Sequence, residues 1–268
     1  MKLQNANVVV TGGSQGIGRE IARVAAAKGA NVLLVARSED LLKELANEIG
    51  GEYIVADLTN ESDLDGLVDA AVERMGHVDV WVNNAGLETS GTFTTTDRDI
   101  VRSVVRLNLE ATTLLTHDIL GHMLPRGGGH IVQMSSVAGA ISFPGLAAYC
   151  GTKAGLTNLT ETLRLELAGS GIGLTVVAPG PVDTEMWDRL EEANQKYVNS
   201  SLKRFRLVQF LPKVTPEKLA AAVVKAVEGG KPHVRLARRF APFHMLNNLP
   251  RRLVAITLTG IKPKAQDR

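Results

Sequence analysis

The chain has 268 residues, of which 44% are hydrophobic and 22% are charged. This length is enough to bury a full hydrophobic core, and α/β folds of roughly 200–250 residues often form one domain. The single cysteine excludes an internal disulfide framework and any multi-cysteine metal site, which favours a reducing, cytoplasmic compartment. No apolar run reaches the ~18 residues of a membrane span, and the first strand begins early, so neither a span nor a signal peptide is expected.

The net charge of +2 conceals an uneven distribution. Residues 202–268 contain 15 Lys and Arg against 3 Asp and Glu, a balance of +12, whereas residues 1–201 contain 15 basic and 25 acidic residues, a balance of −10. This split predicts either ion pairing between the two parts or a basic surface for an anionic partner. The basic stretch has no interleaved aromatic platform, so nucleic acid is not an expected partner.

Short apolar runs rich in β-branched residues alternate with helical patterns. Strands are expected at residues 7–10, 31–36, 53–56, 78–82, 130–134 and 174–178. Helices are expected at residues 17–28, 39–49, 97–123 and 146–168. Few polar residues interrupt the strand runs, as is typical of a parallel sheet that is buried on both faces.

Repeated strand–helix–strand units predict an α/β fold with a doubly wound, Rossmann-type parallel sheet of about seven strands and helices on both faces. No linker composition interrupts the pattern, so residues 1–237 are predicted to form a single domain. Residues 238–268 do not continue the alternation, and they are predicted to be a basic, apolar C-terminal extension.

A glycine-rich segment, Thr11-Gly-Gly-Ser-Gln-Gly-Ile-Gly18, follows the first predicted strand and opens the first helix. This arrangement places backbone N–H groups at a helix N-terminus, which suits a pyrophosphate. Gly12 permits the tight turn, Gly16 lets the backbone approach phosphate, and Gly18 lets the helix pack closely on the sheet. A purely structural turn is the alternative, and a nucleotide-triphosphate loop is excluded because no Gly-Lys-Ser/Thr follows.

Tyr149 and Lys153 are four residues apart in a predicted helix, so they lie on the same face. A free phenol has a pKa near 10, which is a poor match for proton transfer at neutral pH. A nearby ammonium group stabilises the phenolate, so we expect Lys153 to lower the pKa of Tyr149. An ordinary surface Tyr/Lys pair is the alternative.

Two further polar residues are candidates for the same site. Ser136 follows the strand expected at 130–134, and sites in open α/β sheets form at the C-terminal ends of strands. Its hydroxyl can hydrogen-bond a carbonyl oxygen, and Ser135 is the competing candidate. Asn108 is a polar residue in an otherwise apolar helix, and a satisfied core asparagine is the alternative. The histidines lack metal-ligand spacing and no Gly-x-Ser-x-Gly nucleophile elbow is present, so no metal is expected.

Together these motifs resemble the short-chain dehydrogenase/reductase family, in its branch of about 250 residues with a Tyr-x3-Lys active site. The glycine segment, Asn83–Gly86, Ser136, Tyr149-x3-Lys153 and Pro179–Gly180 match in order between residue 5 and about 235. The resemblance implies an oxidoreductase that interconverts a carbonyl and an alcohol by hydride transfer.

The resemblance also implies roles for single residues. The 13-residue offset from Ser136 to Tyr149 favours Ser136 over Ser135. Asn108 is implied to kink its helix and to hold a water that links Lys153 to solvent. Lys153 is implied to hold the nicotinamide ribose hydroxyls, and oxidised nicotinamide is implied to lower the pKa of Tyr149 further.

The end of the second strand indicates the cofactor. Ala36 stands where relatives that prefer NAD usually carry Asp, and Arg37 offers a bidentate fork to a 2′-phosphate, with Ser38 beside it. We therefore predict NADP(H), and a solvated loop charge is the alternative for Arg37. The resemblance adds the remaining cofactor-binding residues, which are Ser14, Gln15, Ile17, Asp57, Leu58, Asn84, Ala85, Gly86, Tyr149, Lys153, Pro179, Gly180, Val182 and Thr184. Among these, Asp57 is implied to bind the adenine edge, and Val182 and Thr184 the nicotinamide carboxamide.

The substrate is expected between the segment after Gly86, the loop 137–145 and the stretch 185–214, as the resemblance implies. These segments contribute apolar side chains, namely Leu87, Phe93, Val137, Ile141, Phe143, Met186 and Trp187. They indicate a hydrophobic carbonyl or alcohol such as a lipid, steroid or aryl ketone, with ordinary core packing as the alternative. Glu88 is expected near the mouth, where it would repel an anionic acyl carrier. A 3-oxoacyl-thioester reductase and an NADP(H)-binding regulatory protein are the alternative functions.

The C-terminal extension repeats apolar residues at helical spacing, with basic residues alongside. Leu246, Leu249, Leu253 and Ile256 form this stripe. The pattern fits a helix that packs on the protein body or on a partner subunit, and it also fits peripheral contact with an anionic membrane. The resemblance implies a homo-oligomer, either a dimer or a tetramer.

Overall fold

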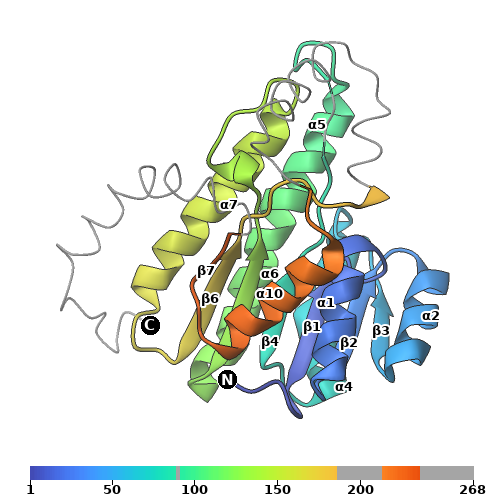
Figure 1. The fold of residues 1–268 in the computed structure, drawn as a ribbon, viewed down its shortest axis with the longest axis vertical. Coiled ribbons are helices and arrows are strands. Elements are labelled where there is room, and N and C mark those ends of the chain that lie inside the picture. Colours follow the sequence, from blue (N-terminus) through green and yellow to red (C-terminus); the bar gives the residue numbers. More distant parts are fainter. Residues whose placement is uncertain (89–90, 186–212, 236–268) are drawn as a thin grey trace.

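The computed structural model describes residues 1–88, 91–185 and 213–235, which are built around one sheet (Figure 1). Its seven strands are hydrogen-bonded in the order β3-β2-β1-β4-β5-β6-β7. They are β1 Asn7–Thr11, β2 Asn31–Ala36, β3 Glu52–Val55, β4 Val80–Asn83, β5 Gly129–Met134, β6 Ile172–Val177 and β7 His233–Val234. Every neighbouring pair is parallel, which confirms the predicted doubly wound α/β sheet.

Helices cover both faces of this sheet. The apolar sides of three helices share one core with β1, β2 and the inner residues of β4 to β6, and they are α1 Gly16–Ala27, α2 Glu39–Ile49 and α10 Pro216–Glu228. The second core contains Trp81, which is fully buried, and three helices, α4 Leu67–Met75, α6 Thr112–Arg126 and α7 Ala147–Glu166. The inner strands are therefore buried on both faces, as the apolar strand runs predict, whereas the edge strand β3 has exposed residues.

The helix expected at 97–123 is divided into three parts. α5 Arg98–Val105 is followed by a π-helical segment, η1 Arg106–Ala111, and then by α6. The Thr112 hydroxyl donates to the Leu107 carbonyl, five residues back, at 3.2 Å. A π-turn contains one more residue than an α-turn and often marks a functional site. Asn108 lies inside this segment, so the long helical stretch is interrupted by a π-turn at the position where the resemblance implies a kink.

The hydropathy pattern does not predict several elements of the structure. The prediction omits α4, α10, β7 and the short α3 Glu61–Leu64. β7 has two residues, which is too few for any alternation to show. α10 begins at Pro216 with Thr215 as its cap, and its side chains pack against α1.

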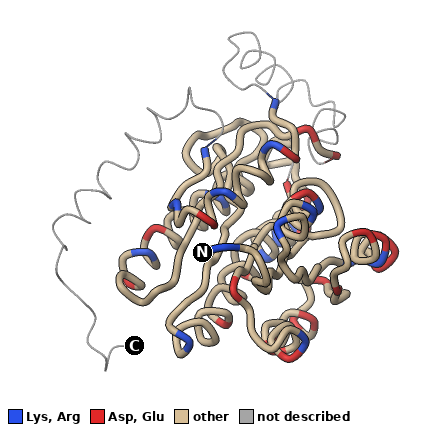
Figure 2. Tube along the Cα trace, turned by 60° about the horizontal axis from the view of Figure 1, so that its bottom comes forward, with Lys and Arg blue, Asp and Glu red and all other residues tan. Residues whose placement is uncertain are grey.

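Charges of both signs are spread over the outer surfaces of the described helices (Figure 2). Arg23 of α1 binds Glu20 at 2.6 Å and Glu48 of α2 at 2.7 Å, and Arg19 binds Glu44 at 2.6 Å. These pairs fix α2 beside α1. The C-terminal extension and residues 186–212 lie outside the described residues, so their domain boundary, packing and membrane contact stay predictions. No helix within the described ranges combines the length and hydrophobicity needed to cross a bilayer.

The strand order brings distant chain segments to one edge of the sheet. After β1 the chain continues to β2 on one side, and after β4 it continues to β5 on the other side. This reversal between β1 and β4 creates the crevice where ligands bind in open α/β folds. The segments that follow the C-terminal ends of the strands carry most of the predicted site residues, from the glycine segment after β1 to Pro179 after β6.

Candidate active site

The glycine segment is too tightly packed for side chains at its key positions. Gly12 and Gly16 have positive φ angles of 62° and 52°, which favour glycine. A Cβ on Gly18 would lie 2.2 Å from the Gly12 carbonyl oxygen and 2.5 Å from the Asn84 side-chain nitrogen. The turn from β1 into α1 therefore requires glycine and leaves the backbone open to a ligand.

Asn84 fastens this turn to the neighbouring strand. Its side-chain Nδ2 donates to the carbonyl oxygens of Thr11 at 3.0 Å and Gly12 at 3.1 Å. The Thr11 hydroxyl accepts hydrogen bonds from the backbone N–H groups of Asn84 and Ala85 at 3.0 and 3.1 Å. The ends of β1 and β4 therefore form one rigid unit.

A cavity of about 340 Å³ runs along this edge of the sheet. It extends from Arg37 and Asp57 at one end to Tyr149 and Lys153 at the other. All but two of the predicted cofactor-binding and catalytic residues line it, and the exceptions are Gly18 and Asn108. Both exceptions touch lining residues, since Gly18 lies against Gly12 and Asn108 holds Leu87.

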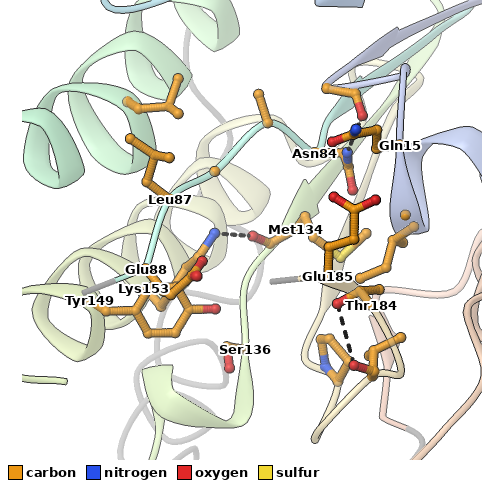
Figure 3. A pocket seen from close by; sticks show the side chains of 18 of the residues that line it. Gln15, Asn84, Leu87, Glu88, Met134, Ser136, Tyr149, Lys153, Thr184 and Glu185 are labelled. Carbon is orange, nitrogen blue, oxygen red and sulfur yellow. Dashed lines mark hydrogen bonds between the residues drawn. The ribbon is translucent and has the colours of Figure 1, made fainter. Parts of the chain in front are cut away.

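Lys153 is buried beneath the catalytic end of this cavity (Figure 3). Its side chain is 4% exposed, and its Nζ donates to the Met134 carbonyl oxygen at the end of β5 at 2.7 Å. The Nζ lies 5.6 Å from the centre of the Tyr149 ring. Burial disfavours the ammonium form and lowers the pKa of Lys153 to about 8.

The pKa of Tyr149 shifts in the direction opposite to the one expected from the sequence. Burial raises this pKa to about 12, although the neighbouring Ser136 hydroxyl lowers it and the Glu88 carboxylate raises it further. Burial is the largest cause of this upward shift, and the expected lowering of the pKa by Lys153 stays a prediction. At neutral pH the phenol therefore carries its proton.

The two adjacent serines face different partners. The Ser135 hydroxyl contacts α7, donating to the Lys153 carbonyl oxygen at 3.0 Å and lying 2.7 Å from the Thr157 hydroxyl. Ser136 begins the short helix η2 Val137–Gly139, and its Oγ accepts from the Ala138 N–H at 3.1 Å. Ser136 is thus the serine beside the phenol, and Ser135 positions the helix that carries Tyr149.

Asn108 has a fully hydrogen-bonded side chain and is 0% exposed. Its Nδ2 donates to the Leu87 carbonyl oxygen at 2.7 Å, and its Oδ1 accepts from the Leu87 N–H at 2.8 Å. Its Nδ2 also lies 3.3 Å from the Thr152 hydroxyl, which donates to the Tyr149 carbonyl oxygen at 2.8 Å. The side chain therefore clamps the segment after β4 against α7, and the implied water relay stays a prediction.

The opposite end of the cavity combines an exposed cation with a structured carboxylate. The Arg37 side chain is 65% exposed, and its Nη1 lies 3.8 Å from the Asp57 carboxylate. Asp57 also accepts from the Thr59 N–H at 2.9 Å and the Thr59 hydroxyl at 2.7 Å. Burial raises the pKa of Asp57, but the Thr59 hydrogen bonds and Arg37 more than compensate and leave it below its ordinary value.

The segment after β6 borders the glycine turn. Val182 pairs with Val214 as an isolated bridge, and Asp183 binds Lys213 at 3.2 Å. Residues 182–183 are therefore held against residues 213–214. A Cβ placed on Gly16 would lie 3.4 Å from Thr184, which shows how closely this segment approaches the turn.

The predicted apolar substrate residues divide into three groups. Leu87, Val137 and Phe143 line the cavity, whereas Ile141 is absent from the lining and Phe93 is 59% exposed on the surface. Met186 and Trp187 lie outside the described residues. The cavity is also lined by residues that the sequence prediction does not assign to it, among them Val35, Ala56, Leu107, Met134 and Leu146. Met134 directly precedes the serine pair, which is the one signal that could have identified it.

Known proteins match this chain along most of its length. The short chain dehydrogenase family model matches residues 6–195. The chain belongs to the short-chain dehydrogenase family. Ketoacyl reductase HetN of Nostoc is 36% identical over 232 residues, which is 84% of this chain and 76% of HetN. An uncharacterized oxidoreductase of Staphylococcus saprophyticus is 34% identical over 194 residues, covering 70% and 79% of the two chains.

Solved structures of short-chain dehydrogenases share the same fold. A variant of actinorhodin polyketide ketoreductase crystallised with NADPH has a TM-score of 0.78, with 31% identity, over 87% of this chain and 95% of that one. A short-chain dehydrogenase from Streptomyces avermitilis has a TM-score of 0.79, with 33% identity, over 94% and 95% of the chains. As a short-chain dehydrogenase, this protein is an oxidoreductase that acts on CH–OH groups of small molecules with a nicotinamide cofactor as acceptor.

Substitution of Gly18 tests the tight packing of the glycine turn. In Gly18→Ala the new methyl carbon would meet the Gly12 backbone at 2.2 Å, and such overpacking costs about 1–3 kcal/mol. We expect a lower unfolding temperature and at least roughly tenfold weaker NADPH binding, since 1.4 kcal/mol corresponds to a factor of ten. Thermal unfolding and fluorescence titration with NADPH measure the two effects.

Gly121→Ala is the matched control. Gly121 is also a helical glycine, but a Cβ there meets nothing within 4 Å. We expect unchanged NADPH binding and a gain of about 1 kcal/mol in stability from the better helix propensity of alanine. Equal losses in the two variants would contradict the assigned role of the glycine turn.

Proposed function

We propose that this protein is an NADP(H)-dependent carbonyl reductase or alcohol dehydrogenase in which Tyr149 is the general acid and base. The observation that carries the proposal is the arrangement of Tyr149, Ser136 and Lys153 around the end of the same cavity that reaches the glycine turn. A proton donor, a polar group for the carbonyl oxygen and a dinucleotide-sized groove are thereby brought together.

The chain's own residues supply proton transfer and orientation. Bound reduced nicotinamide supplies the hydride. Tyr149 holds its proton at neutral pH, which is the state needed to donate to the carbonyl oxygen of a substrate. Ser136 is placed to hydrogen-bond the same oxygen while its charge develops. For alcohol oxidation Tyr149 must release the proton, and the Lys153 ammonium group stabilises the resulting phenolate.

A preference for NADP(H) is supported by the residues after β2. Ala36 offers no carboxylate to a ribose 2′-hydroxyl, and Arg37 projects from the cavity wall with most of its side chain exposed. Its guanidinium can bind a 2′-phosphate through paired hydrogen bonds. Ser38 and Asp57 line the same end, and Asp57 lies within ion-pair distance of Arg37.

A hydrophobic substrate is supported by the apolar wall beside Tyr149. Leu87, Val137, Phe143 and Leu146 contribute to this wall. A 3-oxoacyl-thioester is the second candidate substrate, because the relative HetN is named a ketoacyl reductase and actinorhodin ketoreductase is a structural neighbour. The catalytic geometry serves both, since each presents a ketone to the phenol.

We also propose that this protein forms a homo-oligomer. Ile100, Val105 and Leu114 are large apolar side chains on the α5–η1–α6 helical stretch, and each is between 41% and 51% exposed. Apolar residues spaced along one helical stretch are suited to contact a second copy of the chain.

Tyr149→Phe tests the proton donor. This variant retains the ring but removes the hydroxyl, so we expect kcat for carbonyl reduction to fall by roughly 10²–10⁴. NADPH binding should be retained, because phenylalanine preserves the packing. Steady-state assays that follow nicotinamide absorbance across a panel of ketones and aldehydes give kcat, and fluorescence titration gives the affinity.

Tyr53→Phe is the control for this variant. Tyr53 lies on β3, outside the cavity, with its hydroxyl 3.5 Å from Glu39. Its loss should leave turnover unchanged. Wild-type rates in Tyr149→Phe would refute the assigned proton donor.

Arg37→Asp tests the cofactor preference. Loss of a charge-assisted contact costs about 1.5–3 kcal/mol, so NADPH affinity should fall by roughly 10- to 150-fold. NADH affinity should rise, because the new carboxylate can accept a hydrogen bond from the ribose 2′-hydroxyl. Arg98→Asp reverses an exposed charge on α5 and is the control. An unchanged NADPH affinity in Arg37→Asp would exclude the proposed phosphate contact.

A further inference from the structure

One buried hydroxyl joins three elements that end at the candidate active site. Thr116 lies on α6, and its hydroxyl donates to the Thr112 carbonyl oxygen, one turn earlier, at 2.6 Å. The same oxygen accepts from the Asn83 Nδ2 at 3.0 Å and from the Gln133 Nε2 at 2.7 Å. A hydroxyl has one proton and two lone pairs, so these three contacts use its whole hydrogen-bonding capacity.

The two amides come from adjacent strands. Asn83 of β4 pairs with Gln133 of β5 in the register of the sheet, and both side chains reach α6. The Trp81 indole N–H donates to the Asn83 Oδ1 at 2.8 Å, which turns the Asn83 Nδ2 towards Thr116. Gln133 is fully buried, and its Oε1 has no hydrogen-bond partner within the described residues. The Thr116 hydroxyl is thus the group that satisfies this buried amide.

Each strand residue of this network is followed by a residue that builds the site. Asn84, next to Asn83, fastens the glycine turn to β4. Met134, next to Gln133, provides the carbonyl oxygen that binds the Lys153 Nζ at 2.7 Å (Figure 3). A displacement of either strand end at the network would therefore move the cofactor turn or the partner of the buried amine.

The network also reaches the π-helical segment. Thr112, whose carbonyl oxygen accepts from Thr116, donates its own hydroxyl proton to the Leu107 carbonyl oxygen at 3.2 Å. Asn108 follows Leu107 and binds both backbone polar groups of Leu87, at 2.7 and 2.8 Å. Hydrogen bonds therefore link Thr116 to the clamp on the segment after β4.

We propose that Thr116 is a positioning residue, whose hydroxyl fixes the spacing between the glycine turn, the buried Lys153 amine and the Asn108 clamp. Thr116 is not among the residues that line the cavity, so it acts through its two amide donors and through Thr112. The reaction that this spacing serves is the proposed carbonyl reduction, and the inference rests on that function.

Thr116→Val tests this role, because valine has nearly the same shape but no hydroxyl. Both buried amides would lose their acceptor, so we expect Tm to fall by roughly 5 °C. At a temperature where the variant is folded, kcat for ketone reduction should fall by roughly 10- to 100-fold, with a smaller change in KM, because misplaced groups cost most in the transition state. Thr116→Ser keeps the hydroxyl and should restore kcat.

Thr160→Val is the matched control. Thr160 lies on α7, is also fully buried, and its hydroxyl donates to the Leu156 carbonyl oxygen, one turn earlier, at 2.7 Å. In the part of the chain that the structure describes, no side-chain amide donates to this hydroxyl. The variant loses the same kind of bond to its own helix without leaving an amide unsatisfied, so kcat should stay at the wild-type value.

Gln133→Met separates positioning from stability. It removes the link to β5 together with the Oε1 that has no partner within the described residues, so Tm should stay close to that of the wild type. The proposal still requires kcat to fall, because β5 carries the carbonyl oxygen that binds Lys153. This variant decides the matter if Thr116→Val does not fold.

Amide hydrogen exchange keeps the proposal separate from the proposed function. The Leu87 N–H donates to the Asn108 Oδ1, so its exchange rate reports on the clamp. Relative to the amides of β2, this rate should rise roughly tenfold in Thr116→Val and stay unchanged in Thr160→Val. If no ketone is turned over, the reductase function fails, and the exchange rates still decide whether Thr116 holds the clamp.

Two results would overturn the role of Thr116. The first is wild-type turnover in a folded Thr116→Val or in Gln133→Met. The second is an unchanged relative exchange rate at Leu87 in Thr116→Val, or an equal rise in Thr160→Val.

Discussion

The burial of one amine constrains the rest of the site. Lys153 is 4% exposed, so its ammonium form requires a polar partner, and the Met134 carbonyl oxygen at the end of β5 provides one. This contact fixes α7 relative to the sheet edge and thereby fixes the Tyr149 ring above the amine. Ser135, which follows β5, also holds α7 in this position, because its hydroxyl donates to the Lys153 carbonyl oxygen.

The same constraint explains why three strands must end together. β1 supplies the glycine turn, β4 supplies Asn84 and the segment held by Asn108, and β5 supplies Met134 and the serines. A Cβ on Gly86 would lie 3.2 Å from the Asn108 Oδ1 and 3.5 Å from the Lys153 Nζ, so this glycine lets the clamp and the amine approach one another. The cofactor groove and the proton donor are therefore parts of one packed unit.

The sequence predicts the sheet and the residues around the cavity, because apolar periodicity and the glycine turn are local signals. It does not predict the π-helical segment, since an extra residue in one turn leaves a short hydropathy pattern unchanged, nor β7, which has two residues. The sequence also does not predict the direction of the Tyr149 pKa shift, because desolvation depends on tertiary burial. The roles of Asn108 and Arg37 remain predictions, although their positions are now known.

Tyr149 holds a neutral phenol in the free protein, and we expect its pKa to fall once oxidised nicotinamide places a positive charge beside it. The chain has three tyrosines, so NMR of isotope-labelled tyrosine can follow each Cζ, and comparison with Tyr149→Phe assigns the signal of Tyr149. Titration should give a pKa of about 12 for the free protein and a value displaced towards neutrality with oxidised NADP bound. A Tyr149 pKa that stays near 12 in the complex would contradict this account.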